Sequence, residues 1–218
     1  MRVELVDKMG SDLSVVNAAR VSYSKVADEM TDKDEKLIKY LVEHNHWSPF
    51  AHAAIQFRIQ APVYVARQLV KHQVGLSWNE VSRRYVSYEP EIRKIDQWRG
   101  KPKDSKQGSS GLLDLPPEVI DRYNKHLDDS IKIYKELLYF EVAPEQARTV
   151  LPQCMQTEWI WSGTLYAFAR VCNLRCQPDT QEETRGIANM MYAFLDREFP
   201  ISWKYLCPKK GIDSVKGV

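Results

Sequence analysis

No stretch of the chain approaches the roughly 20 consecutive apolar residues that a membrane-spanning helix needs. The first residues, MRVELVDKMGSDLS, also lack the apolar run of a secretion signal. The formal net charge is only +2, so the chain has no overall field that would attract nucleic acid or a membrane surface. These absences predict a soluble cytoplasmic protein that has neither nucleic acid nor a membrane as a partner.

Cysteine is scarce, and its four copies include no C-x-x-C pair. Cys172 and Cys176 lie four positions apart, so a helix would place both thiols on one face. A metal bound there would still need further ligands. A disulfide framework is not expected in a chain of this size without a secretion signal. We therefore expect buried thiols and no metal, with a two-thiolate metal site as the alternative.

Two glycine motifs are also missing from the sequence. Without G-x-G-x-x-G, the chain has no Rossmann cradle for a dinucleotide. A serine hydrolase built on Ser82 and His72 is disfavoured, because there is no G-x-S-x-G elbow and no acid is evident that would orient the histidine.

The composition that remains is ordinary for a globular protein, with 44% hydrophobic and 28% charged residues over 218 positions. This length fits one domain, which we expect to span residues 1–218. Residues 54–60, AIQFRIQ, alternate apolar and polar side chains and predict a half-buried strand, and residues 2–6 predict another. Helical spacing predicts helices over 34–44, from 62 to about 74, from 117 onward, over 144–174 with a break near 152, and over 180–199. Strands followed by a helical half are typical of the α+β class.

Residues 99–111, RGKPKDSKQGSSG, contain no apolar side chain. Such a segment can bury nothing, so we predict a mobile loop over about 99–111. Its basic residues could attract phosphates, but a solvated linker is the favoured interpretation.

Polar side chains crowd the stretch 68–85, directly after an amphipathic helix. Ser82 and Arg84 alternate as in an extended strand, which would project both side chains to one side. A hydroxyl beside a guanidinium suits a phosphate, because the planar guanidinium carries a permanent charge and the hydroxyl adds a hydrogen bond. The alternative is a solvated helix end followed by a charged strand.

Several blocks together make the chain resemble the flavin-dependent thymidylate synthases over about residues 15–205. The family signature R-H-R-x7-S, usually continued as N-E-x-S-x-R-Y, stands here as KHQ at 71–73 and NEVSRRY at 79–85. Other blocks that resemble the family, in the family's order, are ARVS at 19–22, HWSPFAH at 46–52, APVYVARQ at 61–68, ARTVLP at 147–152, NLR at 173–175 and QEE at 181–183.

This resemblance implies the family's α+β fold, a central antiparallel or mixed sheet with long helices in the C-terminal half. It also implies methylation of dUMP to dTMP with FAD as cofactor, methylenetetrahydrofolate as carbon donor and NADPH as reductant. The implied catalytic residue is Arg175, beside the uracil ring, where it would stabilise developing negative charge. The dUMP-binding residues implied are Gln68, Lys71, Glu80, Ser82, Arg84, Arg148 and Arg175.

The resemblance further implies a homotetramer whose flavin sites lie at subunit interfaces. The FAD-binding residues implied are His46, Ser48, Lys71, His72, Gln73, Glu80, Thr164 and Arg170.

The sequence departs from the family mainly on the flavin side. KHQ replaces R-H-R at 71–73, and one extra residue precedes Ser82. Thr164 and Arg170 stand where the family commonly has asparagines. Two alternatives therefore stay open: a related flavin-dependent enzyme that modifies C5 of another pyrimidine nucleotide, and a catalytically inactive nucleotide-binding homologue.

Overall fold

The computed structural model describes residues 1–86, 88–103 and 108–208. A four-stranded sheet in the order β1-β2-β4-β3 forms its centre. The strands are β1 (Arg2–Met9), β2 (Ala54–Pro62), β3 (Leu76–Glu80) and β4 (Gln156–Thr164). All three neighbouring pairs are antiparallel, so the predicted α+β class is confirmed and the sheet is antiparallel rather than mixed.

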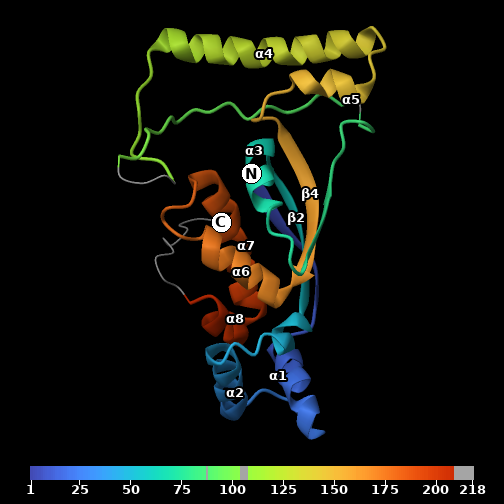
Figure 1. The fold of residues 1–218 in the computed structure, drawn as a ribbon, viewed down its shortest axis with the longest axis vertical. Coiled ribbons are helices and arrows are strands. Elements are labelled where there is room, and N and C mark those ends of the chain that lie inside the picture. The colour runs from blue at the N-terminus through green and yellow to red at the C-terminus, as the bar shows by residue number, and fades with distance from the viewer. Residues whose placement is uncertain (87, 104–107, 209–218) are drawn as a thin grey trace.

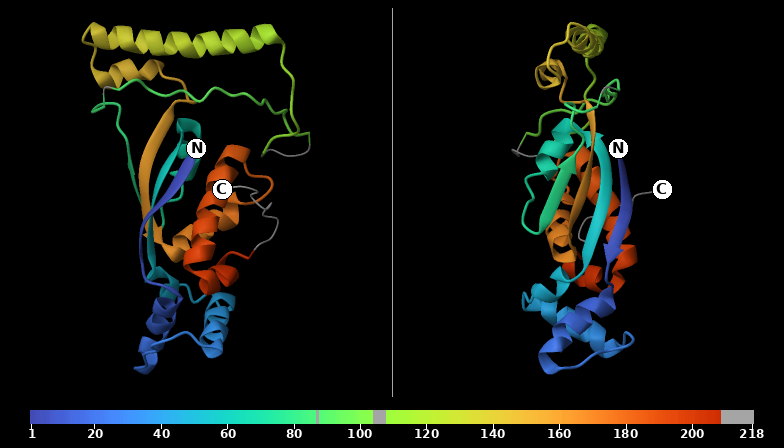
Figure 2. Two further views of the ribbon diagram at one scale, coloured as in Figure 1. Left: turned by 180° about the vertical axis from the view of Figure 1, so that it is seen from behind. Right: turned by 90° about the vertical axis from the view of Figure 1, so that its right-hand side faces the viewer.

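One face of the sheet forms the core. Ile55, Phe57 and Ile59 are buried, as their alternation predicts. The register places Phe57 opposite Trp161, and Trp161 in turn opposite Trp78. Two helices, α6 (Leu165–Arg175) and α7 (Glu182–Glu198), cover this face, and Phe168 of α6 packs edge-on against Phe57 and Trp161 (Figures 1 and 2).

Three helices gather at one end of the sheet: α1 (Asp12–Arg20), α2 (Asp32–Glu43) and α8 (Pro200–Leu206) (Figure 1). The buried carboxylate of Asp12 accepts hydrogen bonds from the backbone N–H groups of Ile201 (2.9 Å) and Ser202 (2.8 Å). Asp12 therefore caps the last helix from the first one. The sequence predicted α2, but neither α1 nor α8, and the N-cap of α2 is Thr31.

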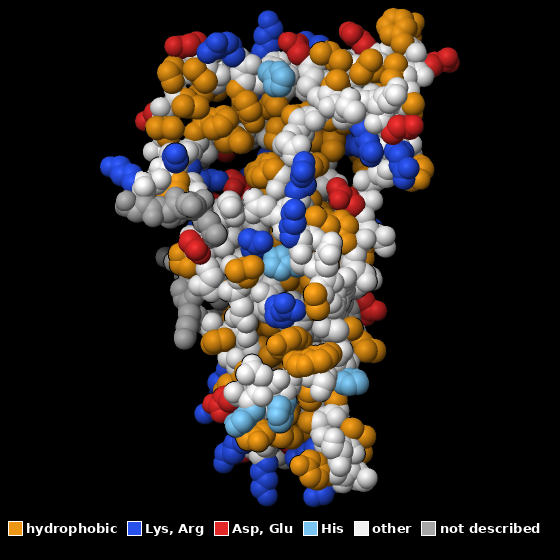
Figure 3. Space-filling model, viewed as in Figure 1, with side chains coloured by type: hydrophobic (Ala, Val, Ile, Leu, Met, Phe, Trp, Pro, Cys, Tyr) orange, Lys and Arg blue, Asp and Glu red, His pale blue; other side chains and the backbone are white. Residues whose placement is uncertain are grey.

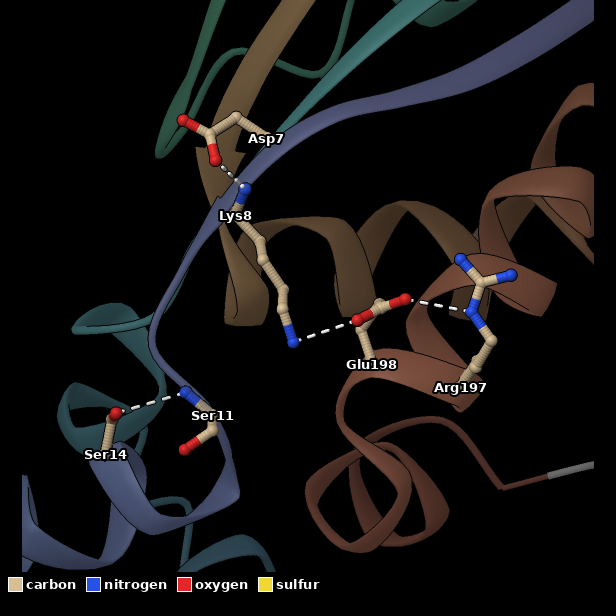
Figure 4. Close-up of polar contacts among 6 residues, drawn as sticks. All are labelled: Asp7, Lys8, Ser11, Ser14, Arg197 and Glu198. Atoms are coloured by element: carbon tan, nitrogen blue, oxygen red, sulfur yellow. Dashed lines mark hydrogen bonds and ion pairs between the residues drawn. The ribbon is translucent and has the colours of Figure 1, made fainter.

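Polar contacts also tie β1 to α7 next to this junction (Figure 4). Lys8 Nζ lies 2.9 Å from Glu198 Oε2 at the end of α7. The Ser14 hydroxyl accepts a hydrogen bond from the backbone N–H of Ser11 at 3.1 Å, which completes a capping box at the start of α1.

The other end of the sheet carries an arm that stands across the molecule (Figure 1). It consists of α4 (Pro117–Tyr139), α5 (Pro144–Ala147) and the 3-10 helix η3 (Arg148–Val150). The start of α4 at residue 117 agrees with the prediction, and at 1.5 Å per residue its 23 residues extend about 34 Å. Tyr139 and Phe140 at its end are 82% and 75% exposed.

The predicted helix over 144–174 is confirmed at its two ends, by α5 and α6, but is wrong between them, because strand β4 lies inside that range. The segment 156–161, QTEWIW, alternates buried and half-buried side chains as a central strand does. Its mixture of aromatic and branched residues also favours a strand. The short helix α3 (Val63–Leu69) likewise ends earlier than predicted, well before Gly75.

Residues 104–107 of the predicted mobile loop lie outside the described residues, so its mobility stays a prediction. On either side of them the chain pairs with itself: Arg99 bridges Leu112, and the Gly100 N–H donates to Gly111 O at 3.0 Å. The Arg99 guanidinium forms ion pairs with Glu182 and Glu183 at the start of α7.

A glycine pair shapes the turn that leads into β3. Leu76 N–H donates to Gln73 O at 3.1 Å, and Gly75 has the positive φ of +76° that this turn requires. Gly163 of β4 lies directly beneath the turn. A Cβ at Gly163 would stand 2.6 Å from the Gly75 carbonyl oxygen, so only glycine allows the turn to approach the strand this closely.

Gly163→Ala is therefore expected to lower the free energy of unfolding by about 1–3 kcal/mol, the usual cost of forcing atoms into a packed site. Gly111→Ala is the matched control, because a Cβ there meets nothing within 4 Å. Urea unfolding of both variants measures the difference. Equal stability of the two variants would contradict this account of the turn.

Candidate active site

Two predicted site residues that lie far apart in the sequence, His72 and Arg175, meet in the structure. Gln68 lies in α3, His72 follows that helix, and Arg175 is the last residue of α6. Arg175 Nε donates a hydrogen bond to His72 Nε2 at 3.0 Å, across 103 positions of sequence. The prediction that these residues share one site therefore has direct geometric support for His72 and Arg175.

His72 is held as a neutral ring by its surroundings. Burial lowers its pKa below the ordinary value, and the positive charges of Arg175 and Arg170 lower it further. A neutral ring can accept the hydrogen bond from Arg175 at Nε2, which leaves the proton on Nδ1. Among the described residues only its Nε has a hydrogen-bond partner, so the other N–H groups of the Arg175 guanidinium can meet an anionic or carbonyl oxygen.

Predicted flavin-site residues line two neighbouring cavities. His46 and Arg170 line one of about 180 Å³, together with Trp47 and Tyr166, whose ring centroids are 6.1 Å apart. His46 and Ser48 line the other, of about 530 Å³. Figure 3 shows Lys, Arg and His side chains along the middle of the molecule, over α6.

Thr164 has a structural role in addition to its predicted one. Its side-chain oxygen accepts a hydrogen bond from the Ala167 N–H at 3.1 Å and so caps α6. Lys71 and Gln73 flank His72 and are both exposed, and Gln73 forms the turn described above.

A further cavity, of about 390 Å³, lies where β3 ends and contains Glu80 and Arg148. Glu80 is held by two donors: Thr157 Oγ1 donates to Oε1 at 2.7 Å, and Trp78 Nε1 donates to Oε2 at 3.2 Å. The carboxylate is thereby fixed as an acceptor at the cavity wall.

Arg83 also lines this cavity, although it was not among the predicted site residues. It is only 6% exposed, donates to Tyr88 O at 2.6 Å and lies 4.5 Å from the centre of the Tyr88 ring. Neither Arg83 nor Thr157 could be distinguished in the sequence. Arg83 stands in a run of charges, and Thr157 acts across 77 positions.

The prediction that Ser82 and Arg84 alternate along a strand is wrong. β3 ends at Glu80, and residues 82–85 form a turn in which Tyr85 N–H donates to Ser82 O at 3.0 Å. The two side chains still meet, because Ser82 Oγ accepts from both the backbone N–H (3.3 Å) and Nε (3.5 Å) of Arg84. The Ser82 hydroxyl and the Arg84 guanidinium therefore lie side by side as predicted, but a turn brings them together and not a strand.

The predicted residues thus form separate groups within one chain. Glu80 and Arg148 line a cavity whose walls include none of Gln68, Lys71 and Arg175. At the usual strand rise, the five steps from Gly75 to Glu80 span about 17 Å.

The described residues include no group of three or more His, Cys, Asp or Glu side chains able to hold a metal ion. All four cysteines are free and buried, and burial raises the pKa of Cys207 to about 12. Over the same part of the chain, no helix has the length and apolar character to cross a membrane.

Comparison with known proteins identifies the family. Residues 4–201 match the family model of thymidylate synthase complementing proteins. The chain belongs to this family. Among curated members, the flavin-dependent thymidylate synthase of Thermosipho africanus is 38% identical over 188 residues, which cover 85% of this chain and 82% of that one. A Thermus thermophilus enzyme of the same name is 36% identical over 201 residues, 92% of this chain and 73% of that one.

Solved structures also share the fold. A UMP/dUMP methylase of Streptomyces cacaoi, bound with 5-Br dUMP, is 30% identical and superposes with a TM-score of 0.80, covering 94% of this chain and 93% of that one. The same enzyme bound with 5-Br UMP is matched at 26% identity with a TM-score of 0.77, covering 94% and 92%.

The pKa of His72 in the folded protein is expected to lie below 6.5. As the pH falls, His72 is therefore protonated in the unfolded chain before it is protonated in the folded protein. The contribution of the neutral ring to stability is complete above pH 6.5. That contribution is lost as the pH falls through the folded-state pKa. An NMR titration of His72 measures this pKa directly.

The variant Arg175→Ala tests whether Arg175 lowers the pKa of His72. The substitution removes a neighbouring positive charge and part of the burial, so the pKa of His72 should rise toward 6.5. A value at or above 6.5 in the unaltered protein would show that Arg175 does not hold a neutral ring.

Proposed function

We propose that this protein is an FAD-dependent thymidylate synthase that methylates dUMP at C5, with methylenetetrahydrofolate as carbon donor and NADPH as reductant. The observation that carries the proposal is the hydrogen bond from Arg175 to a neutral His72, in a chain of this family. Its relatives from Thermosipho and Thermus, at 38% and 36% identity, bear the name of this activity.

Arg175 is the proposed catalytic residue. A half-buried guanidinium that is oriented by His72 keeps a fixed positive charge in a partly water-excluded site. Such a charge stabilises negative charge as it develops on the uracil ring, without reorganisation at the moment of reaction. The chain needs no nucleophile of its own for this role, so Ser82 is assigned to substrate binding.

The remaining dUMP-binding residues supply complementary chemistry. Ser82 and Arg84 offer the phosphate a hydroxyl and a guanidinium that already lie together in the turn. Glu80 is fixed as an acceptor and suits a sugar hydroxyl or a ring N–H. The other proposed ligands of dUMP are Gln68, Lys71 and Arg148.

The residues proposed to bind FAD match the chemical groups of this cofactor. Arg170 supplies a positive charge for a diphosphate, and the Trp47–Tyr166 pair beside His46 supplies flat apolar surface for a ring. When bound, reduced flavin supplies the hydride that completes the methyl group. The chain orients the reactants around it through Ser48, Lys71, His72, Gln73, Glu80 and Thr164.

We also propose that the protein works as a homotetramer with active sites at subunit interfaces. The support is the separation of the Glu80–Arg148 cavity from the Arg175–His72 pair within one chain. The arm built on α4 provides a surface for assembly, because apolar side chains gather beneath that helix in Figure 3 and Tyr139 and Phe140 are exposed at its end.

The double variant Tyr139→Glu, Phe140→Glu is expected to shift the protein to a smaller assembly, since two charges would be buried at the interface. Sedimentation velocity measures the mass of the particle. Val26→Glu is the matched control, because Val26 is 79% exposed and lies in the segment between α1 and α2, at the opposite end of the molecule. A double variant that sediments like the unaltered protein would exclude this surface from the interface.

The test of the activity is tritium release from dUMP labelled at C5. Release is expected only when FAD, NADPH and methylenetetrahydrofolate are all present, with dTMP as the product by mass spectrometry. A parallel reaction with UMP is needed because one solved structure similar to this one is a UMP/dUMP methylase. Binding of dUMP without any release would contradict the proposal and favour an inactive nucleotide-binding homologue.

A further inference from the structure

Gln68, a proposed ligand of dUMP, is held by a residue that no sequence motif singles out. Its Oε1 accepts a hydrogen bond of 2.9 Å from the hydroxyl of Thr184, which lies 116 positions later in the chain. Thr184 is in the first turn of α7, which packs directly on α3. The contact joins two elements that both face the middle of the molecule (Figure 1).

The Thr184 side chain is fully buried, with 0% exposure. Water therefore cannot satisfy its hydroxyl, and a buried hydroxyl without a partner is costly. The amide oxygen of Gln68 is the acceptor that the fold provides. In this arrangement the oxygen end of the amide faces inward, toward Thr184.

A side-chain amide is otherwise free to turn end for end, because its terminal torsion is broad and roughly two-fold. One orientation presents an acceptor to a ligand, and the other presents two donors. Since Oε1 is occupied by Thr184, the Nε2 group is the one left to face a ligand.

The first turn of α7 is itself well anchored. Arg99 forms ion pairs with Glu182 and Glu183, the two residues that precede Thr184. Arg185 donates to Pro178 O at 2.7 Å on the following side. The hydroxyl of Thr184 is thus presented from a backbone that is fixed on both sides.

We propose that Thr184 is a positioning residue that makes Gln68 a hydrogen-bond donor to an oxygen atom of the bound nucleotide. The inference rests on the proposed function, because it takes Gln68 to be a ligand of dUMP. The group recognised would be a phosphate or carbonyl oxygen, since only an acceptor can pair with the Nε2 donors.

The test measures the dissociation constant of dUMP by calorimetry on the flavin-loaded protein. Thr184→Val keeps the shape of the side chain but removes the hydroxyl, so dUMP should bind about three- to tenfold more weakly, the value of one hydrogen bond. Thr184→Ser keeps the hydroxyl and should bind dUMP nearly as tightly as the unaltered protein. Ser130→Ala is the matched control: it removes another buried hydroxyl, which donates to Leu127 O at 2.7 Å in the distant helix α4.

A double-mutant cycle separates positioning from general support of the fold. If Thr184 acts through Gln68, then adding Thr184→Val to Gln68→Ala should cause no further loss of affinity. A loss of the same size in both backgrounds would overturn the inference, as would Thr184→Val with unchanged affinity. Failure of the unaltered protein to bind dUMP would instead overturn the proposed function, and this inference with it.

Discussion

The pairing of β2 with β4 is the constraint on which the rest of the structure depends. Nine residues of each strand are in register, from Ala54 opposite Thr164 to Pro62 opposite Gln156. Helix α3 leaves one end of this ladder, and α6 leaves the other. The ladder therefore sets the positions of His72, which follows α3, and of Arg175, which ends α6. The hydrogen bond between these two residues joins the two segments again.

Local signals were enough to predict much of the fold. The strict alternation in 54–60 predicted β2, and a proline followed by a long apolar stripe predicted α4 from 117. β4 was missed because its short alternation lies between two helical patterns, and the whole range was assigned to one helix. Its two neighbours in the sheet, which lie far away in the sequence, complete the pairing of this strand.

The candidate site was predictable by residue type more than by geometry. Ser82 and Arg84 were correctly expected to lie side by side, but a turn brings them together instead of a strand. Thr157 and Thr184 gave no signal at all, because their significance lies in contacts made across 77 and 116 positions. A threonine in a sequence looks the same whether it supports a ligand-binding side chain or only fills a gap.

The cap that Asp12 places on α8 has a consequence for how the chain is made. Asp12 leaves the ribosome early, but its partners Ile201 and Ser202 emerge only near the end of synthesis. β2 must likewise wait about a hundred residues for β4. The nascent chain thus carries an apolar, half-paired sheet from the synthesis of β2 until that of β4, which is the condition in which chaperones bind unfinished proteins.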